Sequence, residues 1–330
     1  MSLLVVGTVA LDTVKTPFGE VEEVLGGSAT YFSVAASYFT EVHLVTVVGE
    51  DFPAEYMELL QRHRIDLKGL QREKGKTFRW KGQYDYDLNE AHTLDTQLNV
   101  LQTFKPQIPE EYRKIEYVFL ANIDPDLQRD VLHQIERPKL VACDTMNFWI
   151  AGKPEALKRT LQEVDILIIN DAETRQLAQE PNIVKAARKI LSWGPHTLII
   201  KRGEYGVLMF KRNEGMGKQE KGRGEERENS SPSTPLFSLS SVFAAPAYPL
   251  ESVFDPTGAG DSFAGGFMGY LSKVNRIDEA SLRQAIIFGS TIASFNVEDF
   301  SLKRLDKLSE EEIITRFREF KALVDFEHLG

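Results

Sequence analysis

A short segment near the C-terminal end of the chain combines small residues with a carboxylate. Residues 255–261 read Asp-Pro-Thr-Gly-Ala-Gly-Asp, and an apolar, helix-compatible run follows them. We expect a loop that leads into a helix, where unpaired backbone N–H groups carry partial positive charge and can bind an anion. Because glycine lets a phosphate group approach the backbone closely, Gly258, Ala259 and Gly260 are the candidate anion hole.

Asp261 stands at the mouth of this loop. A carboxylate repels phosphate, so anion binding alone does not explain its position. It could accept the proton of a hydroxyl group that attacks the phosphate. The structural alternative is a carboxylate in the first helical turn that stabilises the helix modestly. We favour the catalytic base, because two glycines just before Asp261 open the position to a ligand.

Four motifs together resemble those of the ribokinase-like (PfkB) carbohydrate kinase family. They are the segment 255–261, the di-glycine at 26–28, Asn-x-x-Glu at 170–173 and Lys-x-Gly-x-x-Gly at 201–206. Each motif is weak alone, but the four in the family's order are specific. The resemblance implies a three-layer α/β/α fold with a small β-sheet lid. It also implies Mg·ATP as donor, with Asp261 taking a proton from the hydroxymethyl group of the acceptor.

Asn170 and Glu173 come directly after an expected strand. Ligands bind at the carboxyl ends of strands in open α/β sheets. From spacing alone, a capping box at a helix start explains both residues equally well. The resemblance implies that they help to bind the nucleotide and Mg²⁺, largely through water, which agrees with the few protein ligands that Mg²⁺ uses.

The acceptor contacts are expected near the N-terminus. The resemblance implies that Asp12 binds acceptor hydroxyls, and that Gly26 and Gly27 form a hinge between lid and core. A solvated loop aspartate is the alternative for Asp12. Many family members carry Asn soon after the di-glycine, whereas this chain has Tyr31 and Phe32, which leaves the acceptor open.

The remaining motif residues are expected on the nucleotide side. Lys201, Gly203, Gly206 and Thr257 are candidate nucleotide-binding residues, although a turn between strands explains both glycines without a ligand. The resemblance places Asp255 near a site for a monovalent cation such as K⁺; a turn carboxylate is the alternative.

Composition limits the partners. The 330 residues are 42% hydrophobic and 27% charged, as in an ordinary globular protein, and carry a net charge of −10. This charge disfavours nucleic acid as a partner. No run approaches the length of a membrane span, and no basic region precedes the first apolar run, so neither a membrane nor a secretion signal is expected. The single cysteine, Cys143, suits a reducing cytoplasm.

Short apolar runs alternate with amphipathic segments, which predicts a doubly wound, mostly parallel sheet covered by helices on both faces. The expected strands are residues 3–6, 42–48, 117–121, 140–143, 166–169 and 198–200, with an antiparallel edge pair at 207–210 and 242–244. The expected helices are residues 52–63, 125–135, 154–163, 183–193, 258–272, 279–295 and 310–325.

Two aromatic-rich segments, 13–25 and 77–104, alternate with period two and predict the exposed antiparallel strands of a lid. Trp80, Tyr84 and Tyr86 on this lid could stack on a substrate or pack in a homodimer.

Residues 211–235 are rich in charge and contain one apolar residue, Met216, so we expect a disordered insertion within a single domain spanning 1–330. The main functional prediction is an ATP-dependent kinase for a sugar or a similar small molecule. A nucleoside kinase of the same family and a catalytically silent nucleotide-binding regulator are the alternatives.

Overall fold

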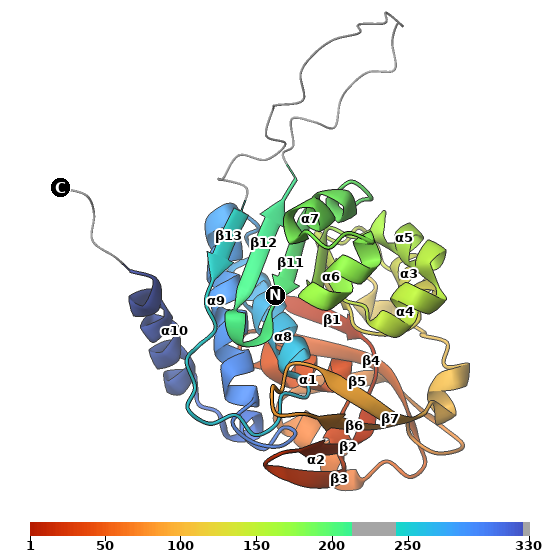
Figure 1. The fold of residues 1–330 in the computed structure, drawn as a ribbon. Helices are drawn as coiled ribbons and strands as arrows, with labels where there is room; N and C mark the ends of the chain where they lie inside the picture. The colour runs from red at the N-terminus through yellow and green to blue at the C-terminus, as the bar shows by residue number, and fades with distance from the viewer. Residues whose placement is uncertain (213–241, 326–330) are drawn as a thin grey trace, which may run out of the picture.

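The computed structural model describes residues 1–212 and 242–325. Its main sheet has nine strands in the order β13-β12-β11-β10-β9-β8-β1-β4-β5 (Figure 1). All neighbouring pairs from β10–β11 to β4–β5 are parallel, while β12 and β13 add antiparallel to the β11 edge. The strands are β1 (Ser2–Val6), β4 (Glu41–Gly49), β5 (Ile65–Glu73), β8 (Tyr117–Leu120), β9 (Leu140–Cys143), β10 (Ile166–Asn170), β11 (Thr197–Lys201), β12 (Val207–Lys211) and β13 (Val242–Ala245).

Helices cover both faces of this sheet, which explains why its central strands are apolar at consecutive positions. In β1, Leu3 and Val5 pack into one hydrophobic core, while Leu4 and Val6 pack into the other. On the first face lie α1 (Ser28–Ser37), α2 (Ala54–Arg62), α8 (Ala259–Val274), α9 (Glu279–Asn296) and α10 (Glu310–Val324). On the second lie α3 (Pro125–Leu132), α4 (Asn147–Gly152), α5 (Pro154–Leu161), α6 (Asp171–Ala178) and α7 (Ile183–Leu191).

A second, four-stranded sheet forms the lid, in the order β3-β2-β6-β7. Its strands are β2 (Ala10–Thr16), β3 (Gly19–Gly26), β6 (Arg79–Tyr84) and β7 (Ala91–Gln97). The expectation of antiparallel strands is correct for the two hairpins and wrong for their junction, because β2 and β6 pair in parallel. Residues Asn99–Thr103, at the end of the second expected segment, form a 3₁₀ helix instead of a strand.

The ribokinase-like α/β fold is therefore confirmed, including the antiparallel pairing of β12 with β13. The sequence analysis did not identify β5 or α1. The expected insertion at 211–235 begins at the last residue of β12, and its residues from 213 onward lie outside the described part of the chain. No helix in the two described ranges is long and apolar enough to span a bilayer.

Candidate active site

The loop before α8 is shaped by one glycine. Gly258 caps α8 in the left-handed region with φ of 74°, a conformation that side chains disfavour. A Cβ atom at this position would also lie 2.3 Å from Cγ of Tyr31, whose ring is buried directly against the loop. The aromatic residue that departs from the family pattern therefore forms the floor of the predicted anion hole.

The backbone N–H groups of this loop are used unequally. Ala259 N–H donates to the carbonyl of Pro256, and Ser262 N–H donates to that of Gly258. The N–H groups of Gly258 and Gly260 have no main-chain acceptor among the described residues. The anion hole that we predicted at residues 258–260 thus retains two available donors, and the Ala259 N–H is already engaged.

Asp261, in the first turn of α8, faces a second carboxyl group. Asp144 directly follows β9, is 4% exposed, and hydrogen-bonds with Asp261. Burial, and then the charge of Asp261, raises the pKa of Asp144 well above its ordinary value. Burial also raises the pKa of Asp261, but Lys201 and the hydrogen bond with Asp144 oppose that rise. Asp144 is therefore the protonated partner, and Asp261 is the one kept ready to accept a proton.

Lys201, the last residue of β11, supplies positive charge at this point. Its Nζ atom lies 2.6 Å from the position that a Cβ atom would occupy on Gly260. The same charge opposes the rise in the pKa of Asp144, Glu173 and Asp261. The structure thus brings the predicted residues of two motifs, 201–206 and 255–261, to one place at the carboxyl edge of the sheet.

Asn170 and Glu173 form the capping box that the sequence offered as their structural explanation. Glu173 N–H donates to Asn170 Oδ1 at 2.7 Å, and Asn170 N–H donates to Glu173 Oε2 at 2.9 Å. Glu173 is nevertheless close enough to Lys201 and Asp261 for their charges to influence its pKa, which burial raises. A structural role and a water-mediated metal role are compatible here, and the metal role stays a prediction.

Asp12 lies in strand β2 rather than in the loop that the sequence indicated. Its carboxylate is 4% exposed and accepts a hydrogen bond from Gly27 N–H at 3.3 Å. Burial raises the pKa of Asp12 to about 7; the Gly27 N–H opposes this rise, and the charges of Asp255 and Asp261 add to it. A Cβ atom on Gly26 would lie 1.9 Å from Asp12 Oδ2, so Gly26 makes room for this carboxylate.

Asp255 and Thr257 hold the loop in place. Asp255 is fully buried, and its two oxygens accept from Thr257 N–H at 2.9 Å and Ser301 N–H at 3.1 Å. Thr257 Oγ1 meets the hydroxyl of Tyr84, on the lid, at 3.4 Å. Asp255 therefore anchors the backbone, and the monovalent cation near it stays a prediction.

Gly203 and Gly206 shape the turn between β11 and β12, with φ of 54° and 84°. A Cβ atom on Gly203 would lie 2.3 Å from Oδ1 of Asn89, which belongs to the lid hairpin between β6 and β7. The turn geometry alone requires both glycines, as the alternative explanation held. Their assignment to nucleotide binding stays a prediction, with the tip of the lid beside it.

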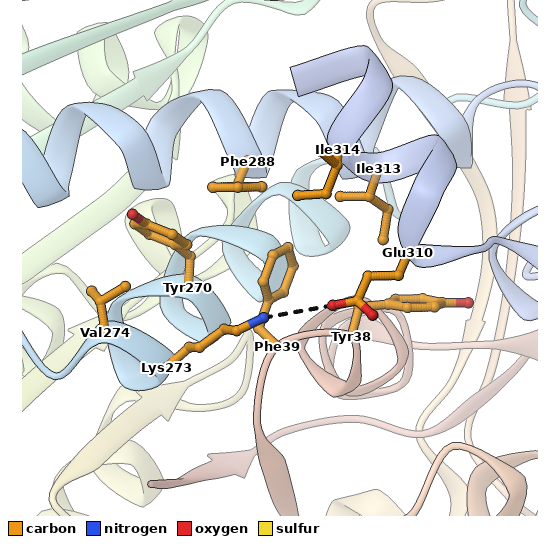
Figure 2. Close-up of a pocket in the computed structure, with 9 residues that line it drawn as sticks. All are labelled: Tyr38, Phe39, Tyr270, Lys273, Val274, Phe288, Glu310, Ile313 and Ile314. Atoms are coloured by element: carbon orange, nitrogen blue, oxygen red, sulfur yellow. Dashed lines mark ion pairs between the residues drawn. The ribbon is translucent and has the colours of Figure 1, made fainter. Parts of the chain in front are cut away.

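The apolar hollow in Figure 2 lies far from this site. It has a volume of about 230 Å³ and is lined by Tyr38, Phe39, Tyr270, Lys273, Val274, Phe288, Glu310, Ile313 and Ile314. Lys273 is twelve residues beyond Asp261 on α8, which is about 18 Å along a helix. Its charged lining residues, Lys273 and Glu310, pair with each other at 3.8 Å, so we assign it no catalytic role.

Comparison with known proteins agrees with this geometry. The model of the pfkB family carbohydrate kinases matches residues 4–223 and 231–306. The chain belongs to this family. It is a kinase with the ribokinase-like fold, and the pfkB motifs are those that meet around Asp261.

Three relatives describe its surroundings in the pfkB family. A cytidine kinase of Thermococcus kodakarensis is 29% identical over 289 residues, which cover 84% of this chain and 91% of that protein. The nucleoside kinase of Methanocaldococcus jannaschii has a TM-score of 0.70 at 19% identity and covers 96% of this chain and 98% of its own. Ribokinase of Thermotoga maritima also has a TM-score of 0.70 at 19% identity, with coverage of 96% and 99%.

Proposed function

We propose that this pfkB kinase transfers the γ-phosphoryl group of ATP to the hydroxymethyl group of a nucleoside, with cytidine as the first acceptor to test. The observation that carries the choice of acceptor is the 29% identity to a cytidine kinase along most of both chains. The sequence alone favoured a sugar, and the nucleoside was its alternative. Nucleosides include the sugar hydroxyls for which Asp12 is suited, so the site accommodates this revision.

In this proposal Asp261 is the catalytic base. The acceptor oxygen attacks the γ-phosphorus, the bond from that phosphorus to the bridging oxygen of ADP breaks, and the hydroxyl proton moves to the Asp261 carboxylate. Lys201 and the N–H groups of Gly258 and Gly260 stabilise the negative charge on the transferred group. Asp144 supports the base by donating a hydrogen bond to it.

The residues present also fit the Mg²⁺ that pfkB kinases use with ATP. Asp144, Glu173 and Asp261 place three carboxyl groups around a single lysine, Lys201, so a cation completes the local charge balance. Glu173 and Asn170 would hold the ion largely through water, because the capping box already engages their side chains. When bound, Mg²⁺ neutralises charge on the phosphates.

Turnover of Mg·ATP, followed by ADP release, would test the proposal with cytidine, uridine, adenosine, inosine, ribose and fructose as acceptors. We expect a nucleoside to be phosphorylated on its hydroxymethyl group, which ³¹P NMR of the product identifies. Turnover of free sugars alone would return the assignment to a sugar kinase. ATP binding without turnover of any acceptor would favour the silent regulator.

The same assay tests the base. Asp261→Asn should lower kcat by about 10²- to 10⁴-fold, because the amide cannot accept the proton, while ATP affinity changes little. Asp130→Asn is the matched control, since Asp130 is exposed on α3. Equal kcat values for the two variants would contradict the role of Asp261.

A further inference from the structure

The inner face of the lid is defined by strand register. Asp12 on β2 is directly opposite Trp80 on β6, and Val14 is opposite Gly82. Residues opposite each other in a strand pair point to the same face, and alternate residues along a strand share that face. Tyr84 therefore shares it too, and its hydroxyl reaches Thr257 at 3.4 Å. This face points into the candidate active site.

Trp80 is held over this face by a glycine. A Cβ atom on Gly82 would lie 2.1 Å from Cη2 and 2.3 Å from Cζ2 of the indole, so its six-membered ring covers Gly82. The indole N–H donates to Thr93 Oγ1 at 3.2 Å on the neighbouring strand. Trp80 is only partly buried, and no ring of the described residues stacks on it. A fixed indole with room above it is a platform for a planar ligand.

The other lid aromatics do not share this arrangement. Tyr86 is 87% exposed at the hairpin tip, and Phe18 is 53% exposed and packs edge-on against Phe254. The structure thus separates the two roles that the sequence left open for lid aromatics. Trp80 and Tyr84 face the site, whereas Tyr86 faces solvent.

We infer that Trp80 stacks on the base of the nucleoside whose ribose hydroxyls are held by Asp12. This inference rests on the proposed function and specifies how that site selects its acceptor. Adjacent strands are about 4.8 Å apart, and the base of a nucleoside is one bond from the ring that carries the hydroxyls. A ribose bound to Asp12 therefore places its base within reach of Trp80, and a free sugar has no group to place there.

Two variants and one control test this inference. Trp80→Leu should raise KM for cytidine about 10-fold or more, with kcat nearly unchanged, because stacking on an aromatic residue is lost. Gly82→Ala should have the same effect while retaining Trp80, since its Cβ displaces the indole. Trp80→Phe should restore most of the affinity. Trp149→Phe, on α4, is the matched control and should behave as the wild type.

A binding measurement complements the kinetics. Cytidine without ATP should quench tryptophan fluorescence in the wild type and in Trp149→Phe, and the quenching should be absent in Trp80→Phe. Nucleoside turnover and quenching that are indifferent to Trp80 would overturn the inference and leave the proposed function intact. If wild-type enzyme neither binds nor phosphorylates any nucleoside, the proposed function fails, and the inference fails with it.

Discussion

Asp12 is a carboxylate held where burial opposes its charge. Its side chain is 4% exposed, and Gly26 must lack a side chain to leave it room. An ionised Asp12 would accept hydrogen bonds from two neighbouring hydroxyls of an acceptor, and such charge-assisted bonds are strong. The cost of ionising this group without a ligand falls on the stability of the folded protein.

This cost depends on pH. The pKa of Asp12 is about 7 in the folded protein against 3.8 when unfolded, so the unfolded state loses its proton first as pH rises. The neutral form of Asp12 is unpenalised below pH 3.8, and stability is lost progressively between there and about pH 7. Asp12→Asn removes this titration. We expect the unfolding free energy of the variant, relative to wild type, to grow by about 2 kcal/mol between pH 5.5 and pH 8.

Urea unfolding at the two pH values measures this difference. Any hydrogen bond changed by the amide shifts both values equally, so only the pH-dependent part reports the titration. A constant difference at both pH values would contradict the raised pKa of Asp12.

Gly258 is required twice, by its positive φ and by the ring of Tyr31. Gly258→Ala should lower the unfolding free energy by about 2 kcal/mol and reduce kcat, because the anion loop must move. Gly152→Ala, on α4, is the control, since no atom outside its own segment lies within 4 Å of the added Cβ. Calorimetry and ATP turnover compare the two; a tolerant Gly258 would contradict the close packing of Tyr31.

The sequence located most of the site, because its residues belong to motifs. Asp144 belongs to none of them, and only the sheet order brings it beside Asp261. It does immediately follow a buried strand, and a carboxylate in that position was a usable signal. The position of Lys201 beside Gly260 is also a product of packing between distant elements, which spacing along the chain does not reveal.

At the scale of elements, a guanidinium joins the lid to the main sheet. Arg79 begins β6 and is 18% exposed; its Nε donates to Glu23 on β3 at 2.6 Å, and its Nη1 meets Asp51 Oδ2, beyond β4, at 2.9 Å. Asp51 Oδ1 also accepts from both the N–H and the hydroxyl of Thr77, just before β6. These contacts fix the base of the lid to the core.

Loss of this junction should loosen the lid. Arg79→Met keeps the apolar stem and should lower the unfolding free energy by about 1–2 kcal/mol, and it should also speed protease cleavage in the β6–β7 hairpin. Lys68→Met is the control, because its ion pair with Glu111 is exposed on both sides and contributes little. Urea titration and timed proteolysis measure both effects. Equal responses of the two variants would contradict the proposed junction.

The elements missed by sequence analysis share a physical cause. β5 is an edge strand whose residues are mostly polar and only partly buried, so it lacks the apolar run of its neighbours. Nine of the ten residues of α1 are buried, and apolar and polar residues surround the helix on all sides, so no amphipathic period marks it. Tertiary burial defines both elements, whereas local pattern defines α7 and α5.

At the scale of the whole molecule, the chain between β12 and β13 invites removal. Phe210 pairs directly with Val242, so the ends of residues 213–241 meet at one edge of the sheet. Replacing 213–241 by a two-residue Asn-Gly turn should leave kcat unchanged and should not lower stability, since a shorter loop costs less entropy to close. A variant that keeps the length and scrambles the sequence is the control.

ATP turnover and thermal unfolding measure the outcome. Loss of activity in both variants would show that the replaced sequence contributes to function, contrary to its interpretation as a dispensable insertion. A homodimer formed through the lid stays a prediction, and sedimentation velocity of the same samples tests it.

The parallel seam between β2 and β6 has a consequence for how the protein matures. Each lid hairpin pairs locally, but Leu11 meets Arg79 only after α1, β4, α2 and β5 have been made and packed. Contacts between distant segments close large loops and form late in folding. A growing chain therefore carries Asp12 on one finished hairpin long before Trp80 arrives on the other. The acceptor site is created by the last steps of folding, and only a correctly completed molecule can recognise its substrate.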